Sequence, residues 1–389
     1  MNFSFNDKNV LLILNYGGLG GAERQALGLA RYLTKKKDCQ VKVLQIYSGF
    51  QTEEFNEYAK KCHIDEILYF GDPYLFLKKE WSFKNIKRLK WSLQYLWRLR
   101  NGLKSNKPDI IIPFLNVPSK IAFFLYKLLP SVKITFWHQL GLDVVKGDWF
   151  ETIAASYTPF VIGNAPNCLD IFQEQFKASK SKLNLLPQYL TLEKVNKDSK
   201  DLRTSLGIPI NRVVIGMIAQ YRTDKYFDLL LEAYRQLYLD VDTHLVFLGN
   251  KDNNESSLRI FSDLHRKIKK NELEGRVSVL SNIPVEDVLN IIDIGVLLSQ
   301  IEGVSNSVME YMSYGIPVLA TNHPGTKILL GDSEFLIPND IELIKKSLKK
   351  LINSEGVRKS EGRNNSSKIL NFNASNYVCK LEQIINHYL

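Results

Sequence analysis

Residues 302–321 read EGVSNSVMEYMSYGIPVLAT, and this stretch decides the fold of the second half of the chain. It follows the uninterrupted apolar run Ile294–Leu298 and ends in a second apolar run, Pro317–Ala320. Because Ser305 and Asn306 are residue types that cap helices, the pattern predicts a strand, a turn, a helix and another strand in succession. Apolar strands that alternate with helices are typical of a parallel sheet covered on both faces.

The same alternation continues outward along the chain. Helices are predicted at Glu23–Leu33 and Tyr226–Leu239, and a charged, unpatterned stretch at Val195–Asp201 is read as a linker. Further strands are predicted at Val10–Leu14, Val41–Ile46, Ile110–Phe114, Val132–Trp137, Phe160–Ile162, Val213–Ala219, His244–Leu248 and Val277–Leu280. The fold class is therefore α/β, with two doubly wound Rossmann-like domains that face a cleft. We expect domains at 1–190 and 191–365, followed by a C-terminal helix within 366–389.

The turn after the first predicted strand is rich in glycine, reading GGLGGAE at 17–23. Glycines there let a ligand approach the backbone, and the N-terminus of the following helix attracts anions. The spacing is not GxGxxG, and Lys42 lies near the place where an acid would bind a ribose, so a dinucleotide cofactor is disfavoured. The simpler alternative is a tight turn between a strand and a helix.

Two glutamates, Glu302 and Glu310, flank the predicted helix start with seven residues between them. Free backbone N–H groups at such a helix start can bind a diphosphate. Glu310, about one turn into the helix, could accept hydrogen bonds from both hydroxyls of a ribose, whereas Glu302 lies nearer to a group on the distal phosphate. The alternative is a solvated acid beside an ordinary capped helix.

Together with the following GIPVLAT, this stretch resembles the retaining glycosyltransferases of the GT-B fold with the EX7E motif, which are family 4-like. Their run EG(F/L)SNxxxEAMxxGxPVVAT aligns with about 20 residues here. Residues 215–233 look like the family stretch GRLxxxKGxDxLIxA, and GGLGGAE looks like its acceptor-side loop. The resemblance thus spans both halves of the chain.

The resemblance implies a set of site residues in this sequence. Glu302, His138 and Lys225 are the expected catalytic residues, with Glu302 and His138 near the donor sugar and Lys225 on the phosphates. The family's usual arginine is replaced by Gln220, and Arg222 is the expected substitute, although glutamine cannot give the bidentate grip of a guanidinium. The expected donor-binding residues are Gly18, Gly20, Gly21, Arg222, Lys225, Gly303, Val304, Ser305, Asn306, Ser307 and Glu310.

No cofactor or metal is expected, because amides and cations can neutralise the diphosphate of a nucleotide sugar. The sequence Asp240-Val241-Asp242 is interpreted as a surface turn rather than a metal site. The four cysteines have no CxxC spacing, which suits a reducing compartment. No run of about 18 apolar residues occurs, and the N-terminal residues do not resemble a signal peptide. We therefore expect a cytoplasmic protein.

The net charge of +10 is concentrated in the segment 78–107, which carries ten basic residues and one acid, Glu80. Apolar residues recur there at helical spacing (Ile86, Leu89, Leu93, Leu96 and Trp97, widened by Trp81, Trp91 and Tyr95). A basic amphipathic helix with tryptophans can lie on an anionic bilayer, so we expect peripheral attachment to the inner face of the plasma membrane. A helix that merely packs on its own sheet is the alternative. Nucleic acid is not an expected partner, since no nucleic-acid-binding module accompanies the charge.

The predicted function is transfer of a sugar from a nucleotide-diphosphate sugar, with retention, to a glycan acceptor. The basic segment favours a lipid-linked acceptor, such as a polyprenyl-diphosphate glycan, in bacterial surface polysaccharide or glycolipid synthesis. Another enzyme of the same fold is a weaker alternative. A nucleotide-sugar-binding module without turnover, or a basic membrane-associated adaptor, remains an alternative of a different class.

Overall fold

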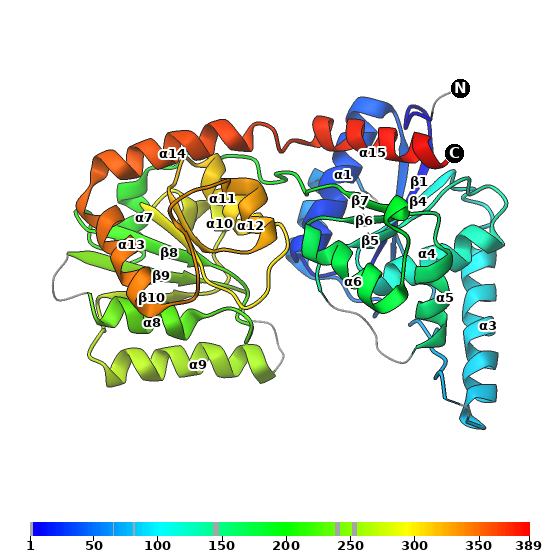
Figure 1. Ribbon diagram of the computed structural model, residues 1–389, viewed down its shortest axis with the longest axis horizontal. Coiled ribbons are helices and arrows are strands. Elements are labelled where there is room, and N and C mark those ends of the chain that lie inside the picture. The colour runs from blue at the N-terminus through cyan, green and yellow to red at the C-terminus, as the bar shows by residue number, and fades with distance from the viewer. Residues whose placement is uncertain (1–2, 65, 81, 143–147, 238–241, 251–254) are drawn as a thin grey trace. The chain divides into compact units, whose positions relative to one another are not determined.

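The computed structural model describes residues 3–64, 66–80, 82–142, 148–237, 242–250 and 255–389. The chain divides into two compact units (Figure 1): unit 1 contains Met1–Thr191 and Asn373–Leu389, and unit 2 contains Leu192–Phe372. The second domain was expected at 191–365, and unit 2 begins one residue later, at Leu192, and continues to Phe372. The last helix belongs to unit 1. Within the described residues, no helix is both long and apolar enough to span a bilayer. Trp81 of the basic segment lies outside the described residues.

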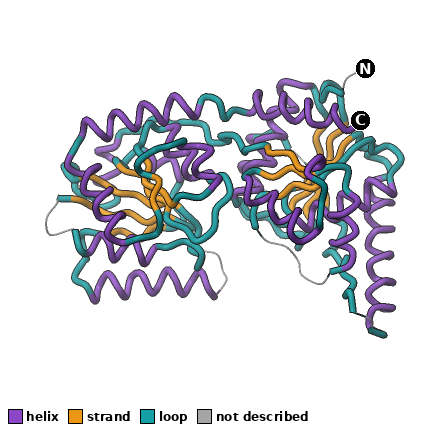
Figure 2. The backbone as a smooth tube through the Cα atoms, in the orientation of Figure 1, coloured by secondary structure: helices purple, strands orange, loops and turns teal. Residues whose placement is uncertain are grey.

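Unit 1 is built on parallel strands with helices around them (Figure 2). One sheet has the strand order β3-β2-β1-β4, and β5-β6-β7 continue it through a bridge between Ile110 and Ile134. The strands are β1 Asn9–Leu14, β2 Gln40–Gln45, β3 Ile67–Leu68, β4 Ile110–Pro113, β5 Trp137–Gln139, β6 Val161–Gly163 and β7 Leu183–Leu185. The helices are α1 Gly21–Lys37, α2 Glu53–Lys61, α3 Lys84–Leu103, α4 Asn116–Leu128, α5 Trp149–Tyr157, α6 Pro166–Phe176 and α15 Ala374–Tyr388, with a short 3₁₀ turn η1 at Lys180–Lys182.

One predicted strand of unit 1 was misplaced. Residues 132–137 were expected to form a strand, but the structure has a single bridge at Ile134 and begins β5 at Trp137. The neighbouring strand β4 ends at Pro113, which has no N–H group to donate to a partner. The ladder therefore stops there, and β5 instead pairs with β6.

Unit 2 holds a six-stranded parallel sheet in the order β10-β9-β8-β11-β12-β13. The strands are β8 Val213–Ile218, β9 Thr243–Leu248, β10 Val277–Leu280, β11 Ile294–Leu297, β12 Val318–Thr321 and β13 Leu336–Ile337. The helices are α7 Ser199–Ser205, α8 Phe227–Arg235, α9 Glu255–Lys270, α10 Val285–Leu289, α11 Asn306–Ser313, α12 Pro324–Leu330, α13 Ile341–Asn353 and α14 Glu355–Ile369. Strand order reverses between β8 and β11, and in unit 1 it reverses between β1 and β4. Ligands of doubly wound sheets bind beyond the carboxyl ends of the strands at such reversals.

The stretch predicted as a linker, Val195–Asp201, is structured in its second half. Asp198 caps α7, which begins at Ser199, so the prediction was wrong for these residues. The preceding residues are fastened to unit 2, because the Tyr314 hydroxyl accepts from the Val195 N–H and Asn290 donates to the Val195 carbonyl.

Helix α15 completes unit 1 (red beside α1 in Figure 1). Its apolar side chains Tyr377, Val378, Leu381 and Ile385 are buried in the same core as β1 and α1. At the rim, Glu382 pairs with Lys37 at 3.0 Å, and the Tyr388 ring stacks on Phe160. The sequence pattern predicted this helix but not its place.

The predicted basic helix exists as α3, and its apolar residues divide into two groups. Tyr95, Leu96, Leu99 and Leu103 are buried in unit 1. Ile86, Leu93 and Trp97 are exposed, Trp97 at 65%. The helix therefore packs on unit 1 along one side and presents apolar and basic residues on the other.

Candidate functional site

The reversal of strand order in unit 2 joins two segments that are far apart in the sequence. The loop after β8 forms an antiparallel bridge between Lys225 and Ser299, which follows β11. The Tyr226 N–H donates to the Leu298 carbonyl at 3.0 Å, and the Gln300 N–H donates to the Asp224 carbonyl at 2.8 Å. These backbone contacts bring the predicted lysine beside the predicted glutamate.

Lys225 and Glu302 form a close ion pair at this reversal. The Lys225 Nζ lies 2.6 Å from Glu302 Oε2 and 3.5 Å from Asp224 Oδ2, with both side chains of the Lys225–Glu302 pair largely buried. Arg222 donates to Asp224 at 2.8 Å through its Nε, but its side chain is 55% exposed. One buried cation beside two carboxylates, with a second cation at the edge, can receive a phosphate anion if the ion pairs rearrange.

Helix α11 begins directly after this pair. Ser305 is its N-cap, and its hydroxyl accepts from the Val308 N–H at 3.4 Å. The remaining N–H groups of the first turn, including those of Asn306 and Ser307, stand at the positive end of the helix. Glu310, one turn further, is buried with 6% of its surface exposed. This end of the helix suits a diphosphate.

Gly303 and Val304 are held against the start of α12. A Cβ placed on Gly325 would lie 2.0 Å from the Gly303 carbonyl oxygen and 2.7 Å from the Val304 nitrogen. This glycine is required because the two backbones touch. The loop that precedes α11 is thereby fixed in position.

A hydrogen-bond network that the sequence patterns did not reveal joins the segments that follow β11, β12 and β13. The Ser299 carbonyl is bonded to His323 Nε2 at 3.0 Å and accepts from Asn339 Nδ2 at 2.9 Å, while the Ser299 N–H donates to the Thr321 hydroxyl. These residues follow three neighbouring strands, β11, β12 and β13. The signal available in the sequence was the polar residue after each apolar run.

In unit 1, the predicted glycine-rich turn follows β1 and opens α1, as expected. Gly20 is the N-cap of α1, and Gly21 is its first residue. A Cβ on Gly18 would meet no atom within 4 Å in the described part of the chain, so packing does not demand glycine there. Glu23 is buried in the first turn, and burial raises its pKa to about 7 against the opposing effect of backbone N–H donors.

His138 lies on β5 of unit 1 and is 1% exposed. Its Nδ1 is 3.0 Å from the Pro113 carbonyl, which fixes the proton on Nδ1. Its Nε2 has no hydrogen-bond partner among the residues that the structure describes. Burial lowers the pKa of His138 to about 4, so the ring is neutral at pH 7 and presents Nε2 as an acceptor.

The predicted site residues thus fall into two groups. The first group gathers at the carboxyl edge of the unit 2 sheet and consists of Arg222, Lys225, Glu302 and the residues from Gly303 to Glu310. Gly18, Gly20, Gly21 and His138 lie toward the carboxyl edge of the unit 1 sheet. Asp224, His323 and Asn339 are additions from the structure.

The described residues contain no group of three or more His, Cys, Asp or Glu side chains placed to hold a metal ion. In the Asp240–Asp242 turn, Asp240 and Val241 lie outside the described residues. Asp242 pairs with Arg212 at 2.8 Å and Arg276 at 3.1 Å.

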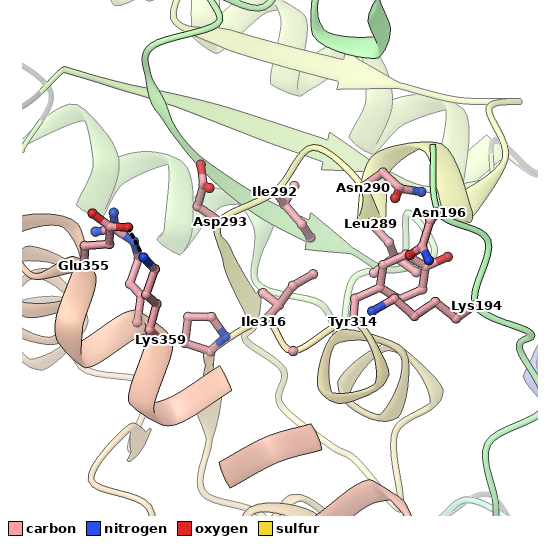
Figure 3. Close-up of a pocket in the computed structure, with 13 residues that line it drawn as sticks. Lys194, Asn196, Leu289, Asn290, Ile292, Asp293, Tyr314, Ile316, Glu355 and Lys359 are labelled. Carbon is pink, nitrogen blue, oxygen red and sulfur yellow. Dashed lines mark ion pairs between the residues drawn. The ribbon is translucent and has the colours of Figure 1, made fainter. Parts of the chain in front are cut away.

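A separate pocket of about 410 Å³ lies near the opposite ends of β11 and β12 (Figure 3). Asp293 and Ile316, which precede these strands, line it together with Tyr314. Glu355 and Lys359 of α14 form an ion pair at its edge. This pocket is distinct from the site at Lys225, Glu302 and the start of α11.

Comparison with known proteins agrees with this geometry. Residues 198–368 match the model of the family described as glycosyl transferases group 1. Comparison of the sequence with those of curated proteins gives no significant match.

Several solved structures share the fold. HepE from Anabaena, crystallised with UDP and glucose, is 16% identical over 97% of this chain and 99% of its own, with a TM-score of 0.76. A glycosyltransferase from Rickettsia africae is 16% identical over 98% and 99%, with a TM-score of 0.75. Sucrose-phosphate synthase from Thermosynechococcus elongatus is 14% identical over 97% and 98%, with a TM-score of 0.72.

Proposed function

We propose that this chain, whose residues 198–368 match the glycosyl transferases group 1 family, is a GT-B glycosyltransferase that moves a sugar from a nucleoside-diphosphate sugar to a glycan acceptor with retention at the anomeric carbon. One observation carries the proposal: the reversal of strand order in unit 2 holds Lys225 and Glu302 2.6 Å apart beside the capped start of α11. A cation and a helix N-terminus are the groups that stabilise a leaving diphosphate.

Each residue of this site has a role in the proposal. Lys225, Arg222 and the first N–H groups of α11 neutralise the diphosphate as the bond to the sugar breaks. Glu310 accepts hydrogen bonds from the ribose hydroxyls, and Glu302 lies near the sugar. His138 belongs to unit 1, and its role near the sugar is the one that the resemblance implies; burial lowers its pKa to about 4, so the ring is a neutral acceptor. These roles follow the family resemblance.

Uridine is the first base to test, because the Anabaena protein of the same fold was crystallised with UDP and with UDP-glucose. The experiment measures melting temperature with UDP-, GDP-, ADP- and CMP-sugars for the wild type, Glu310→Gln and Lys359→Ala. A donor at 100 times its dissociation constant stabilises the folded state by about 2.7 kcal/mol. The Lys359→Ala variant is the control, because this residue lines the other pocket (Figure 3).

The expected result is a shift with one donor class in the wild type and Lys359→Ala that is strongly reduced in Glu310→Gln. A melting shift that disappears in Lys359→Ala instead would indicate that the nucleotide binds in the pocket lined by Lys359. A folded protein that responds to no donor would contradict the proposal.

The acceptor is proposed to be lipid-linked and the enzyme to work at the cytoplasmic face of the plasma membrane, in surface polysaccharide or glycolipid synthesis. The support is α3, where the exposed side chains of Ile86, Leu93 and Trp97 lie on a helix that carries lysines and arginines. Apolar residues can enter the interface while the lysines face anionic head groups.

Vesicle sedimentation tests this attachment with phosphatidylcholine vesicles that either contain or lack phosphatidylglycerol. Replacing Lys84, Lys87 and Lys90 by alanine should reduce binding to the anionic vesicles, by about 1 kcal/mol for each charge at the surface. The control replaces Lys345, Lys346 and Lys349 on α13. Equal binding by both triple variants would remove the membrane proposal.

A module that binds the nucleotide sugar without transfer is the second candidate. The observation that favours it is Gln220, which stands where the resembling family has an arginine, while Arg222 is engaged by Asp224. It predicts a donor-induced melting shift with no release of UDP in the presence of any acceptor or of water. Release of UDP that depends on Lys225 would exclude it.

A further inference from the structure

Two tyrosines occupy equivalent places beyond the unit 1 sheet. Strands β1 and β2 are in parallel register with Leu14 opposite Gln45. Tyr16 and Tyr47 each follow their strand by two residues, so both emerge at the carboxyl edge. Tyr69 follows β3 at the same edge. This edge includes the reversal of strand order between β1 and β4, where ligands of such sheets bind.

The two rings form a stacked pair with one open face. The centroids of Tyr16 and Tyr47 are 5.1 Å apart, and the ring planes differ by 20°. Tyr16 is 55% exposed, whereas Tyr47 is partly buried against the unit 1 core. An aromatic face that is supported from behind and open in front offers a flat apolar surface with a hydroxyl at its rim.

The loop that carries Tyr47 is held firmly against the glycine-rich turn. The Gln45 side-chain amide donates to the carbonyls of Tyr47 and Phe50, at 3.0 and 2.9 Å. The Thr52 N–H donates to the Gly17 carbonyl at 2.8 Å. A Cβ on Gly17 would lie 2.6 Å from Gln51 Cγ, so the turn and the loop are in direct contact.

The far side of the same loop is tied to the segment after β3. Asp72 accepts from the Ser48 N–H at 2.6 Å and from the Tyr69 hydroxyl at 2.8 Å. The loop that carries Tyr47 is therefore anchored on both sides. A ligand that binds here would lose little free energy to ordering of the chain.

A polar group accompanies the aromatic face, because the Tyr16 hydroxyl stands at the rim of its own ring. A phenolic hydroxyl can both donate and accept a hydrogen bond. An aromatic face with such a rim matches a sugar ring, which offers an apolar C–H face and hydroxyl groups at its edge.

We propose that the Tyr16–Tyr47 pair is a platform on which a sugar ring of the acceptor stacks through its C–H face. The inference rests on the proposed function for the identity of the sugar as the acceptor. It names a carbohydrate, not a lipid chain, as the group recognised at the unit 1 reversal.

Saturation-transfer NMR tests the platform with methyl α- and β-glycosides of glucose, galactose, mannose and N-acetylglucosamine as probes. The variants are Tyr16→Ala, Tyr16→Phe and the control Tyr157→Ala, which removes a 70% exposed tyrosine at the end of α5. We expect ring C–H signals of at least one glycoside in the wild type, Tyr16→Phe and Tyr157→Ala. An aromatic contact worth about 1 kcal/mol predicts roughly fivefold weaker binding in Tyr16→Ala.

Two results would overturn the proposal: no glycoside signal in the wild type, or a signal that survives Tyr16→Ala unchanged. The donor-induced melting shift, measured on the same samples, separates this proposal from the proposed function. If glycosides depend on Tyr16 while no donor binds, the platform stands as a sugar site and the transferase proposal fails. If the donor-induced melting shift persists in all variants and glycoside binding is unchanged in Tyr16→Ala, the transferase proposal stands and the platform proposal fails.

Discussion

The two reversals of strand order, one in each unit, share a topology but differ in chemistry. At the unit 2 reversal, a lysine is paired with carboxylates beside a helix whose first turn is capped by Ser305. At the unit 1 reversal, α1 starts from Gly20, which can offer no side-chain cap; the surface presents the stacked tyrosines, and the neutral His138 is buried. The same architecture thus carries an ionic cluster in one unit and an aromatic surface in the other, which under the proposed function would serve the leaving group and the acceptor respectively.

The largest effect that tests this contrast is expected from Lys225→Ala. Hydrogen bonds to charged groups contribute about 1.5–3 kcal/mol, so UDP should bind roughly 10- to 100-fold more weakly. Isothermal titration calorimetry measures the change, with Lys345→Ala on α13 as the control. A change of less than about twofold would show that the unit 2 reversal does not act through its charge.

Glu23→Gln probes the unit 1 reversal through pH. The folded state keeps the Glu23 proton up to a pKa of about 7, against 4.5 when unfolded, so its contribution to stability is present at low pH and lost as pH rises through 7. The uncharged glutamine should therefore stabilise the protein at pH 8 by up to about 3 kcal/mol, and by less than about 1 kcal/mol at pH 5.

Scanning calorimetry at pH 5 and pH 8 measures this difference for Glu23→Gln. The control is Glu54→Gln, an exposed glutamate in the first turn of α2. If Glu23→Gln has the same effect at both pH values, the carboxyl is already ionised in the folded state and the unit 1 reversal is not neutral.

A third change asks how tightly the ionic site is built. Gly325→Ala would place a methyl group 2.0 Å from the Gly303 carbonyl oxygen, so backbone must move. Overpacking of this kind costs about 1–3 kcal/mol, and the loop before α11 should lose affinity for UDP in parallel. Chemical denaturation and calorimetry measure the two effects.

The matched control for this change is Gly356→Ala on α14, where the nearest atom would be Ser354 Oγ at 3.8 Å. It should be neutral or stabilise the helix by about 0.5–1 kcal/mol. Equal behaviour of the two variants would mean that the contact between Gly325 and Gly303 does not define the site.

The smallest expected effect separates the cap of α11 from its ligand. Ser305→Ala should cost about 1 kcal/mol of stability, because the Val308 N–H loses its acceptor. Ser305→Asp should keep that stability yet weaken UDP binding, since a carboxylate would repel the diphosphate. Thermal melts with and without UDP distinguish the two. Tighter UDP binding by Ser305→Asp would place the phosphates away from this helix end.

The sequence predicted most of unit 2 because its signals are local. The strand Val277–Leu280 has the bounds that the structure shows, and the segment from Glu302 to Thr321 forms the expected turn, helix and strand. The expected membrane contact of 78–107 stays a prediction. Strands β3 and β13 were missed because runs of two residues carry no periodicity, and β7 was missed because its Leu-Asn-Leu sequence is not an uninterrupted apolar run.

Contacts between distant segments were beyond the sequence patterns. The pairing of Lys225 with Glu302 depends on which strands are neighbours, and the stack of Tyr16 on Tyr47 depends on the register between β1 and β2. Both properties belong to the assembled sheets. The chemical type of each residue is evident from the sequence. Which residue it contacts is evident only from the folded structure.

The place of α15 has a consequence for the order in which the protein is made. Its residues supply part of the unit 1 core, yet they leave the ribosome after every residue of unit 2. Domains generally fold as units during synthesis, so the unit that starts first is completed last. Until then, the groove that receives Tyr377, Leu381 and Ile385 exposes apolar side chains of α1. Nascent unit 1 is therefore the part of the chain that a chaperone would have reason to hold.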